Sequence, residues 1–334
     1  MKKTLVITIV AFMLVAGTLL ISSLASQPVA AQESIDGDWA GKVRETARGR
    51  MLWLSLNRRE TERNRFQMSL ELPLNDFTGL NTDAGANAQF SLRREAGEVT
   101  FVGLFRNGNG VGEFRFTPQS SFAGAMRNLG YEDELTTQKL FTMTIHDVGT
   151  GFINELRSLG YDKVPLNKLI AMRIHEADGD FIRRMRALGY DNLSTDKLVA
   201  MRIHGVDEQF IREAEAMGFA KLPVDKLVAM RIHGVSREFV ESVKTLGYTN
   251  LPLDKLISMR IHGVNAEFVK EMETAGYRQI SLDKLISMRI HGVNAQFAKE
   301  MRDAGYPNLS LDDLIQLRIH GVDSNYVRKM KGNR

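Results

Sequence analysis

The first part of the chain alternates hydrophobic and polar positions with a period of two. Hydrophobic residues occupy every second position from 66 to 72, the alternation recurs at 89–93 and 99–103, and Phe114 and Phe116 close the series. This pattern is typical of half-buried antiparallel strands. The sequence Asn-Gly-Asn-Gly at 107–110 favours a tight hairpin, because both residue types tolerate positive φ. About six strands fit into 36–118, so the sequence predicts a small antiparallel β-sandwich or meandering barrel with Trp39 and Trp53 as core aromatics.

From about Gln119 the alternation gives way to a 29-residue repeat with helical spacing. In the copy at 253–277, hydrophobic positions i, i+3, i+4 and i+8 predict one apolar stripe on a first helix, formed by Leu253, Leu256, Ile257 and Ile261. Gly263 is expected to end that helix, because glycine readily takes the left-handed conformation. A second helix follows, with its own apolar stripe at Phe268, Val269, Met272 and Ala275.

The residue expected to cap the second helix has the same character in nearly every copy. The seven positions are Gly149, Asp178, Asp207, Ser236, Asn265, Asn294 and Asp323, and all but Gly149 are strong N-caps. The segment 121–131 matches the second helix alone, so 119–331 is interpreted as a half repeat followed by seven helix pairs. A pair this short cannot bury its stripe alone, so the copies are expected to stack. The predicted fold class is α+β multidomain, a β-rich domain at 36–118 followed by an α-solenoid of helix-hairpin repeats.

Two residue types recur in this array at a constant spacing of 29 residues. The histidines stand 29 residues apart, at His146, His175, His204, His233, His262, His291 and His320. An aromatic residue follows each histidine by six positions, at Phe152, Phe181, Phe210, Phe239, Phe268, Phe297 and Tyr326. The histidines are either a row of chemical sites or one architectural residue copied with its repeat.

The architectural interpretation accounts for more of the pattern. Zinc ligands must converge on one point at about 2 Å, whereas equivalent residues of stacked helices lie about 8–10 Å apart. Each histidine instead falls in the last turn of a first helix, where its ring can bond free carbonyls and a positive charge meets the negative end of the helix dipole. We therefore expect both rows to be structural, with no metal, cofactor or catalytic residue. If the rings bond between copies, acidification should loosen the array.

The N-terminus has the character of a secretory signal. Lys2 and Lys3 precede an apolar run from Leu5 to Leu24, and Val29 and Ala31 suit a signal peptidase site. Residues 1–31 are therefore predicted to be a signal peptide, and membrane contact is expected only if residues 5–24 remain as an uncleaved anchor. The chain contains no cysteine, which excludes disulfides and thiolate metal sites. The expected location is periplasmic or extracellular.

Nucleic-acid binding and catalysis find little support. The formal net charge is +4, and loss of Lys2 and Lys3 with the signal lowers it to +2, too little for binding driven by charge. The sequence RIHGVN is similar to the helix-hairpin-helix turn, but residues such as Asp207 and Ser236 replace its second glycine. The stretch at 175–179 has Gly179 where a zinc peptidase motif needs a second histidine, and no nucleophile elbow or phosphate loop is present.

The repeat sequence LDKLISMRIHGV, followed by F…M…AGY, resembles repeats of uncharacterised exported bacterial proteins. The repeat also resembles repeats on the outer side of some membrane-embedded sensor metallopeptidases of the β-lactam-sensing type. The resemblance covers about 119–331, with a looser likeness in the β segment. It implies a bacterial envelope protein and, because no peptidase motif accompanies it, no activity.

The function predicted from the sequence is that of a non-enzymatic interaction protein of the cell envelope. The solenoid would present an extended surface to a protein partner, as stacked repeats commonly do. Specificity is expected on the second helices, whose exposed positions vary between copies, as at 207–209 and 236–238. The alternative is a ligand-binding β domain with the solenoid as a spacer or docking arm.

Overall fold

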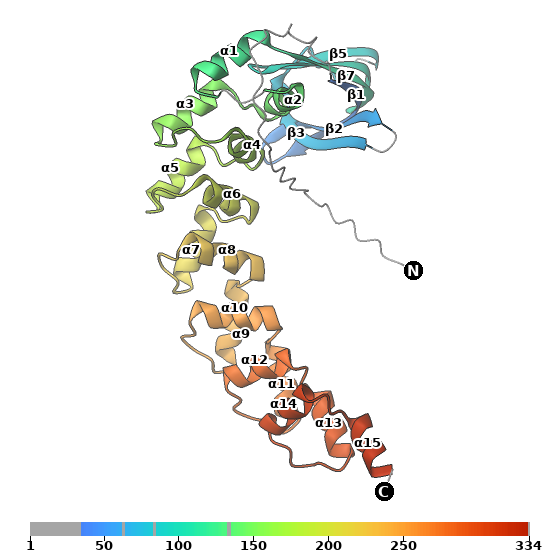
Figure 1. Cartoon of the computed structure of the whole chain (residues 1–334), viewed down its shortest axis with the longest axis vertical. Coiled ribbons are helices and arrows are strands. Elements are labelled where there is room, and N and C mark those ends of the chain that lie inside the picture. The colour runs from blue at the N-terminus through green and yellow to red at the C-terminus, as the bar shows by residue number, and fades with distance from the viewer. Residues whose placement is uncertain (1–34, 62–63, 83–84, 132–134, 333–334) are drawn as a thin grey trace, which may run out of the picture.

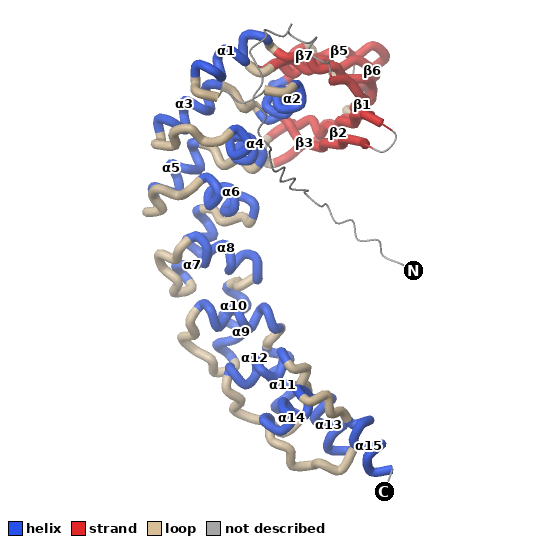
Figure 2. The backbone as a smooth tube through the Cα atoms, viewed as in Figure 1, coloured by secondary structure: helices blue, strands red, loops and turns tan. Residues whose placement is uncertain are grey.

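The structure is a computed structural model that describes residues 35–61, 64–82, 85–131 and 135–332 (Figure 1). The fold is α+β: a curled antiparallel sheet of seven strands is followed, within these residues, by fifteen helices (Figure 2). The predicted signal at 1–31 lies outside the described residues.

The seven strands form one continuous sheet. They are β1 (Ile35–Thr46), β2 (Gly49–Thr61), β3 (Asn64–Pro73), β4 (Phe77–Thr78), β5 (Gly85–Arg94), β6 (Gly97–Arg106) and β7 (Asn109–Pro118), with a short 3-10 turn at Leu74–Asp76. Their order is β3-β2-β1-β7-β6-β5-β4, and all neighbours are antiparallel. This curled half-barrel is closer to the predicted meandering barrel than to a sandwich. It has one strand more than expected, because the two-residue β4 adds to the edge.

Trp39 anchors the core of the curl. Its ring lies against Phe90, Phe101 and Phe105 at centroid distances of 5.2, 5.9 and 5.9 Å. Its Nε1–H donates to the carbonyl of Val102 at 3.2 Å. A Cβ on Gly112 would overlap that carbonyl oxygen and lie 2.9 Å from the indole nitrogen, so glycine is what permits the approach. Trp39 is thus a core aromatic as predicted, while Trp53 is only half-buried and lies under the Arg44 guanidinium at 5.1 Å.

The first helix of the first helix pair fills the opening of the sheet. Helix α2 (Thr137–His146) packs against β1, β5, β6 and β7 (Figure 1). Its Phe141 ring stacks on Phe114 at 5.9 Å and meets the edge of Phe116 at 5.4 Å. Burial of an aromatic side chain of this kind is worth a few kcal/mol. The β-rich part and the first helix pair therefore share one core.

The remaining helices form an elongated, gently curved array of pairs (Figures 1 and 2). Helix α1 (Ser120–Asn128) precedes α2 and covers most of the segment predicted to be the half repeat. The helices are α3 (Thr150–Ser158), α4 (Leu166–Ile174), α5 (Gly179–Ala187), α6 (Thr195–Ile203), α7 (Glu208–Ala216), α8 (Val224–His233), α9 (Arg237–Thr245), α10 (Leu253–His262), α11 (Ala266–Thr274), α12 (Leu282–Ile290), α13 (Ala295–Asp303), α14 (Leu311–Ile319) and α15 (Ser324–Gly332). First helices contact first helices, as in α4 with α6 and α6 with α8, and second helices contact second helices.

The helix ends follow the predicted cap chemistry. At six of the seven predicted N-cap positions, the side chain accepts a hydrogen bond from the backbone N–H three residues later, at Asp178, Asp207, Ser236, Asn265, Asn294 and Asp323. The glycine after each later histidine has φ between 63 and 70°, at Gly205, Gly234, Gly263, Gly292 and Gly321. These caps satisfy backbone groups that a helix end leaves free, and together they fix where each hairpin turns.

One prediction about the first helices is wrong. The spacing places Ile261 in the buried stripe with Leu253, Leu256 and Ile257, but 53% of its surface is exposed. In a helix of 3.6 residues per turn, Met259 lies on the buried side and Ile261 is two residues beyond it, turned away toward solvent. The other three residues of the stripe are buried.

Candidate interaction surface

Three sets of polar contacts join each helix pair to the next. In the first set, a tyrosine after the second helix donates its hydroxyl to a carbonyl 32 or 33 residues later. These bonds run from Tyr131 to Val164, Tyr161 to Leu193, Tyr190 to Leu222, Tyr248 to Ile280 and Tyr277 to Leu309. Burial raises the pKa of each of these phenols, so the hydroxyls remain protonated donors at neutral pH.

In the second set, a lysine of one first helix pairs with an aspartate in the first turn of the next. The pairs are Lys168–Asp196, Lys197–Asp225, Lys226–Asp254, Lys255–Asp283 and Lys284–Asp312. Each aspartate also lies in the first turn of its helix, at the positive end of the helix dipole. Exposed pairs of this kind contribute about 0–1 kcal/mol each, so they set the register more than they stabilise.

The third set involves the arginine two residues before each histidine, from Arg173 onward. For example, the Arg260 Nε–H donates to the carbonyl of His233 in the preceding copy at 2.9 Å, and its guanidinium lies over the Phe239 ring at 5.1 Å. The same stacking on the preceding aromatic occurs in six copies, at Arg173, Arg202, Arg231, Arg260, Arg289 and Arg318. All of these arginines except Arg318 donate Nε–H to a carbonyl at the end of the preceding first helix, so each of the five caps the helix of its neighbour.

The histidines occupy equivalent places at the ends of the first helices. Each is the last helical residue or the residue after it, as in α8, which ends at His233, and α12, followed by His291. The main-chain carbonyls of His146, His175, His233 and His262 accept the arginine bonds described above. This differs from the expected contact of the ring with carbonyls of its own helix: the structure places the bond on the histidine backbone, and its donor is an arginine of the next copy.

The aromatic row is buried except at its end. Phe152, Phe181, Phe210, Phe239, Phe268 and Phe297 lie in the core between copies. Tyr326 is 52% exposed, because no further helix pair follows α15 in the described chain to cover it.

His146 differs from the other histidines because the sheet covers it. Burial, and to a lesser extent the positive charges of Arg173 and His175, lower its pKa from 6.5 to about 4. The ring therefore stays neutral at physiological pH. It borders a cavity of about 710 Å³ between the sheet and the first two helix pairs, which Arg94, Arg173 and Asp147 also line.

A glutamate of the sheet replaces the missing cap at Gly149. The Glu95 carboxylate, in the turn between β5 and β6, accepts from the Thr150 backbone N–H at 3.0 Å and from its hydroxyl at 2.7 Å. Burial raises the pKa of Glu95, but these hydrogen bonds outweigh it and leave the pKa below its ordinary value. A Cβ at position 149 would lie 2.7 Å from the Glu95 oxygen, which explains the glycine there.

A row of exposed isoleucines, not predicted from the sequence, runs along the first helices. One isoleucine precedes each histidine, and six of them are between 45 and 55% exposed: Ile174, Ile203, Ile232, Ile261, Ile290 and Ile319. The seventh, Ile145 in α2, is 1% exposed because the sheet encloses that helix. These six residues are called the isoleucine row below. Its signal is present in the sequence, since an isoleucine recurs two positions after a buried methionine in the first six first helices and after Leu317 in the seventh.

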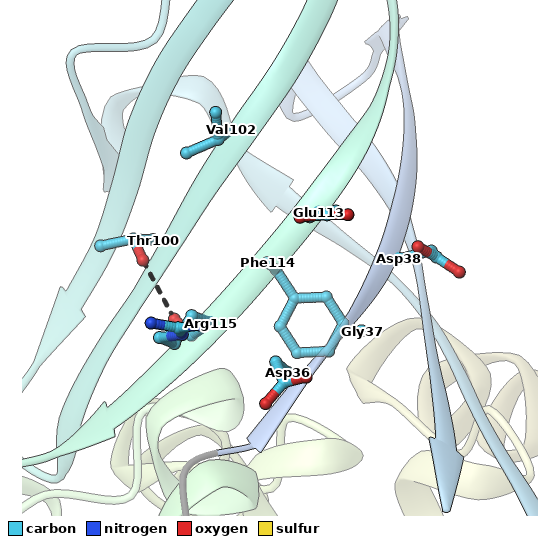
Figure 3. A pocket seen from close by; sticks show the side chains of 8 residues that line it. All are labelled: Asp36, Gly37, Asp38, Thr100, Val102, Glu113, Phe114 and Arg115. Carbon is cyan, nitrogen blue, oxygen red and sulfur yellow. Dashed lines mark hydrogen bonds between the residues drawn. The ribbon is translucent and has the colours of Figure 1, made fainter.

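A second hollow lies on the outer face of the sheet (Figure 3). Residues of β1, β6 and β7 line about 430 Å³, including the carboxylates of Asp36, Asp38 and Glu113. Asp38 is directly opposite Glu113 across the β1–β7 ladder, and the Thr100 hydroxyl donates to the carbonyl of Arg115 at 3.2 Å. Within the described ranges, no group of three or more His, Asp or Glu residues is arranged to hold a metal ion, here or elsewhere.

In the part of the chain that the structure describes, no helix combines the length and apolar character needed to cross a membrane. Comparison with protein-family models, curated proteins and solved structures yields no match.

Proposed function

We propose that this protein is a non-enzymatic component of the bacterial cell envelope whose helix pairs form an α-solenoid that binds a protein partner. The observation that carries the proposal is the isoleucine row, with six large apolar side chains exposed at one equivalent position. Scattered exposed apolar residues are normal on soluble proteins, but a regular row of them is typical of an interaction surface. Ile145 supports this use of the position, because the chain itself covers that residue with an apolar face.

The repeated contacts support the solenoid. The tyrosine, lysine and arginine contacts join one copy to the next at nearly constant separations of 32 or 33, 28, and 26 or 27 residues. Successive pairs therefore repeat nearly the same geometry. Stacked repeats of this kind offer long surfaces with many equivalent positions. Export to the envelope rests on the N-terminal signal pattern and on the resemblance of the repeat.

Affinity capture tests the proposal with full-length variants, because α2 shares its core with the sheet and a cut at 118 would divide that core. The tagged chain and its Ile232→Ser/Ile261→Ser/Ile290→Ser variant would each be cross-linked in envelope extract and the captured proteins quantified by mass spectrometry. We expect a defined set of proteins to be captured by the parent chain and depleted at least about tenfold with the variant.

A matched control comes from the outer face of the sheet. Val102, Leu104 and Val111 are between 51 and 55% exposed, like the isoleucines. The Val102→Ser/Leu104→Ser/Val111→Ser variant should capture the same proteins as the parent chain. Loss of partners with this variant alone would instead support the second candidate, a ligand-binding β domain that the helices carry as a docking arm. The two hollows beside the sheet are the observation that favours this candidate.

A further inference from the structure

The position after the histidine differs between the first two copies and the later ones. Later copies have glycine there, but the first two have Asp147 at φ 56° and Glu176 at φ 55°. Asp147 accepts from Arg173 Nη2 at 2.7 Å, and Glu176 accepts from Arg202 Nη2 at 2.6 Å. In these two copies, an acidic side chain therefore forms an ion pair with the guanidinium of the arginine in the next copy.

The sheet supplies a second arginine to each of these carboxylates. Arg94 Nη1 lies 3.5 Å from Asp147, and Arg48 Nη1 lies 2.5 Å from Glu176. In the first two copies, each carboxylate is therefore paired with one arginine of the next copy and with one arginine of the sheet domain.

In the later copies the same arginines lack such a partner. Arg231, Arg260 and Arg289 still donate through Nε to a carbonyl of the preceding copy. The positions that held Asp147 and Glu176 are now Gly205, Gly234 and Gly263, and within the described ranges no carboxylate lies within 4 Å of these arginines. Arg318 is the equivalent arginine of the last copy, and the preceding copy has Gly292 at the acidic position. Within the described residues, the buried Nε of Arg318 has no hydrogen-bond partner.

Each of these arginines is followed directly by an exposed isoleucine. The pairs are Arg231–Ile232, Arg260–Ile261, Arg289–Ile290 and Arg318–Ile319. One open guanidinium and one exposed aliphatic side chain therefore recur in four successive copies. In each of the first two copies one of the two groups has a partner within the chain. The sheet covers Ile145, with Thr144 at the arginine position, and Arg173 pairs with Asp147 while Ile174 is 45% exposed.

We propose that this face binds an extended polypeptide segment of a partner in which carboxylate and aliphatic side chains recur together. Guanidinium groups bind carboxylates through strong, oriented hydrogen bonds, and the aliphatic groups would cover the isoleucine row. Neighbouring helices lie about 8–10 Å apart and an extended chain rises about 3.3 Å per residue, so one contact falls roughly every three residues. This inference rests on the proposed function and names the chemistry of its partner.

A polypeptide is favoured over a nucleic acid. A phosphate backbone could meet the arginines, but it would leave the isoleucines uncovered. The neighbouring Lys–Asp pairs are already neutral and add no net positive charge along the same helices.

Fluorescence anisotropy with a defined probe tests the inference. The probe is a labelled 15-residue peptide of five Leu-Glu-Ser repeats, added to the chain comprising residues 32–334. Control peptides replace glutamate by glutamine or leucine by serine. We expect binding of the probe that weakens with added salt, and at least about tenfold weaker binding of each control peptide.

Two variants separate the charge from the apolar contribution. Gly234→Glu/Gly263→Glu supplies the carboxylate that the first two copies carry naturally, and a Cβ at either glycine already lies 2.7 Å from the next arginine's Nη2. We expect this variant, and separately Ile232→Ser/Ile261→Ser/Ile290→Ser, to weaken probe binding at least about tenfold. The Val102→Ser/Leu104→Ser/Val111→Ser control should bind like the parent chain. If the glycine variant does not fold, the isoleucine variant and the glutamine peptide still decide the question.

Three results would overturn the inference: no binding of the probe to the parent chain, equal binding of probe and control peptides, or displacement of the probe by a single-stranded oligonucleotide at equal concentration. If the peptide does not bind while capture of envelope proteins still depends on the isoleucine row, the chemistry proposed for the partner is wrong and the interaction function stands. If neither depends on the row, both fail.

Discussion

At the scale of single residues, the same residue type takes different roles in different copies. The isoleucine before the histidine is buried at position 145 and about half exposed in the six later copies. The acidic residues after His146 and His175 hold arginines of both the sheet and the next copy, while later copies have glycine. Identical sequence motifs therefore do not imply identical environments, and the first two copies are adapted to the sheet.

The tyrosine bonds provide a test within the array, because one copy lacks the hydroxyl. Phe219 occupies the place of Tyr190 and Tyr248. Tyr190→Phe removes the donor to the Leu222 carbonyl and should lower stability by about 1 kcal/mol. Phe219→Tyr should raise it by a similar amount through a bond to the Leu251 carbonyl. The measurement is the thermal midpoint followed by circular dichroism at 222 nm, and equal midpoints for both variants and the parent chain would contradict the role of these bonds.

His146 should make the stability of the sheet sensitive to pH. Its pKa in the folded chain, about 4, is below its ordinary value of 6.5 because burial disfavours the charged ring. The folded state binds a proton at this ring less readily than the unfolded state does. The folded state is therefore fully stable above pH 6.5 and loses free energy of unfolding as pH falls from about 6.5 to 4. The expected loss is about 3 kcal/mol at most.

Tryptophan fluorescence measures this loss selectively, because both tryptophans lie in the sheet. The thermal midpoint of the parent chain should fall more steeply between pH 7 and pH 4 than that of His146→Gln. His291→Gln removes a histidine from the equivalent position of a later copy and should retain the steep fall. The same pH dependence in His146→Gln as in the parent chain would show that this ring is not the cause.

At the scale of secondary structure, the elements could be predicted and their mutual contacts could not. The alternation from position 66 to 116 and the caps such as Asp207 and Asn265 are local signals, and the structure has strands and helices there. The spacing puts Ile261 on the wrong side of its helix, because spacing alone does not tell how wide the buried stripe is. The arginine and tyrosine bonds join residues 26 to 33 positions apart, so they depend on the stacking geometry, which the sequence pattern leaves open.

The contact between Glu95 and α3 shows how the sheet completes a helix. Glu95→Ala should lower stability by about 1 kcal/mol, because it removes the cap of the Thr150 N–H and a bond to its hydroxyl. Glu95→Ala/Gly149→Asp should recover most of the loss, since the introduced aspartate would cap α3 as the aspartates and asparagines of other copies cap their helices. Tryptophan fluorescence melts at pH 7 provide the comparison.

Gly149→Asp alone serves as the control for this pair, and it should be destabilising because its Cβ would meet the Glu95 carboxylate. The Glu95 effect should shrink below pH 4.5, since a carboxylate with a lowered pKa loses its contribution as pH falls through that pKa. If the double variant were no more stable than Glu95→Ala, the cap would not be the reason for glycine at 149.

At the scale of the whole molecule, the chain combines one shared core with one extended array. Phe141 joins α2 to the sheet, and from α4 to α12 each first helix contacts the first helices before and after it. Stability in such arrays is approximately a sum of nearest-neighbour contributions, so the distal copies can adapt their surface without disturbing the sheet. This arrangement explains why the isoleucine row and the open arginines occur in the later copies.

Small-angle X-ray scattering of residues 32–334 tests linear stacking most directly. A compact domain of about 300 residues has a radius of gyration of about 19 Å. Seven helix pairs stacked at about 8–10 Å, with the sheet at one end, predict a radius above about 25 Å and a distance distribution with a long tail. A radius near 19 Å with a symmetric distance distribution would show that the pairs fold back on one another, which contradicts the extended surface.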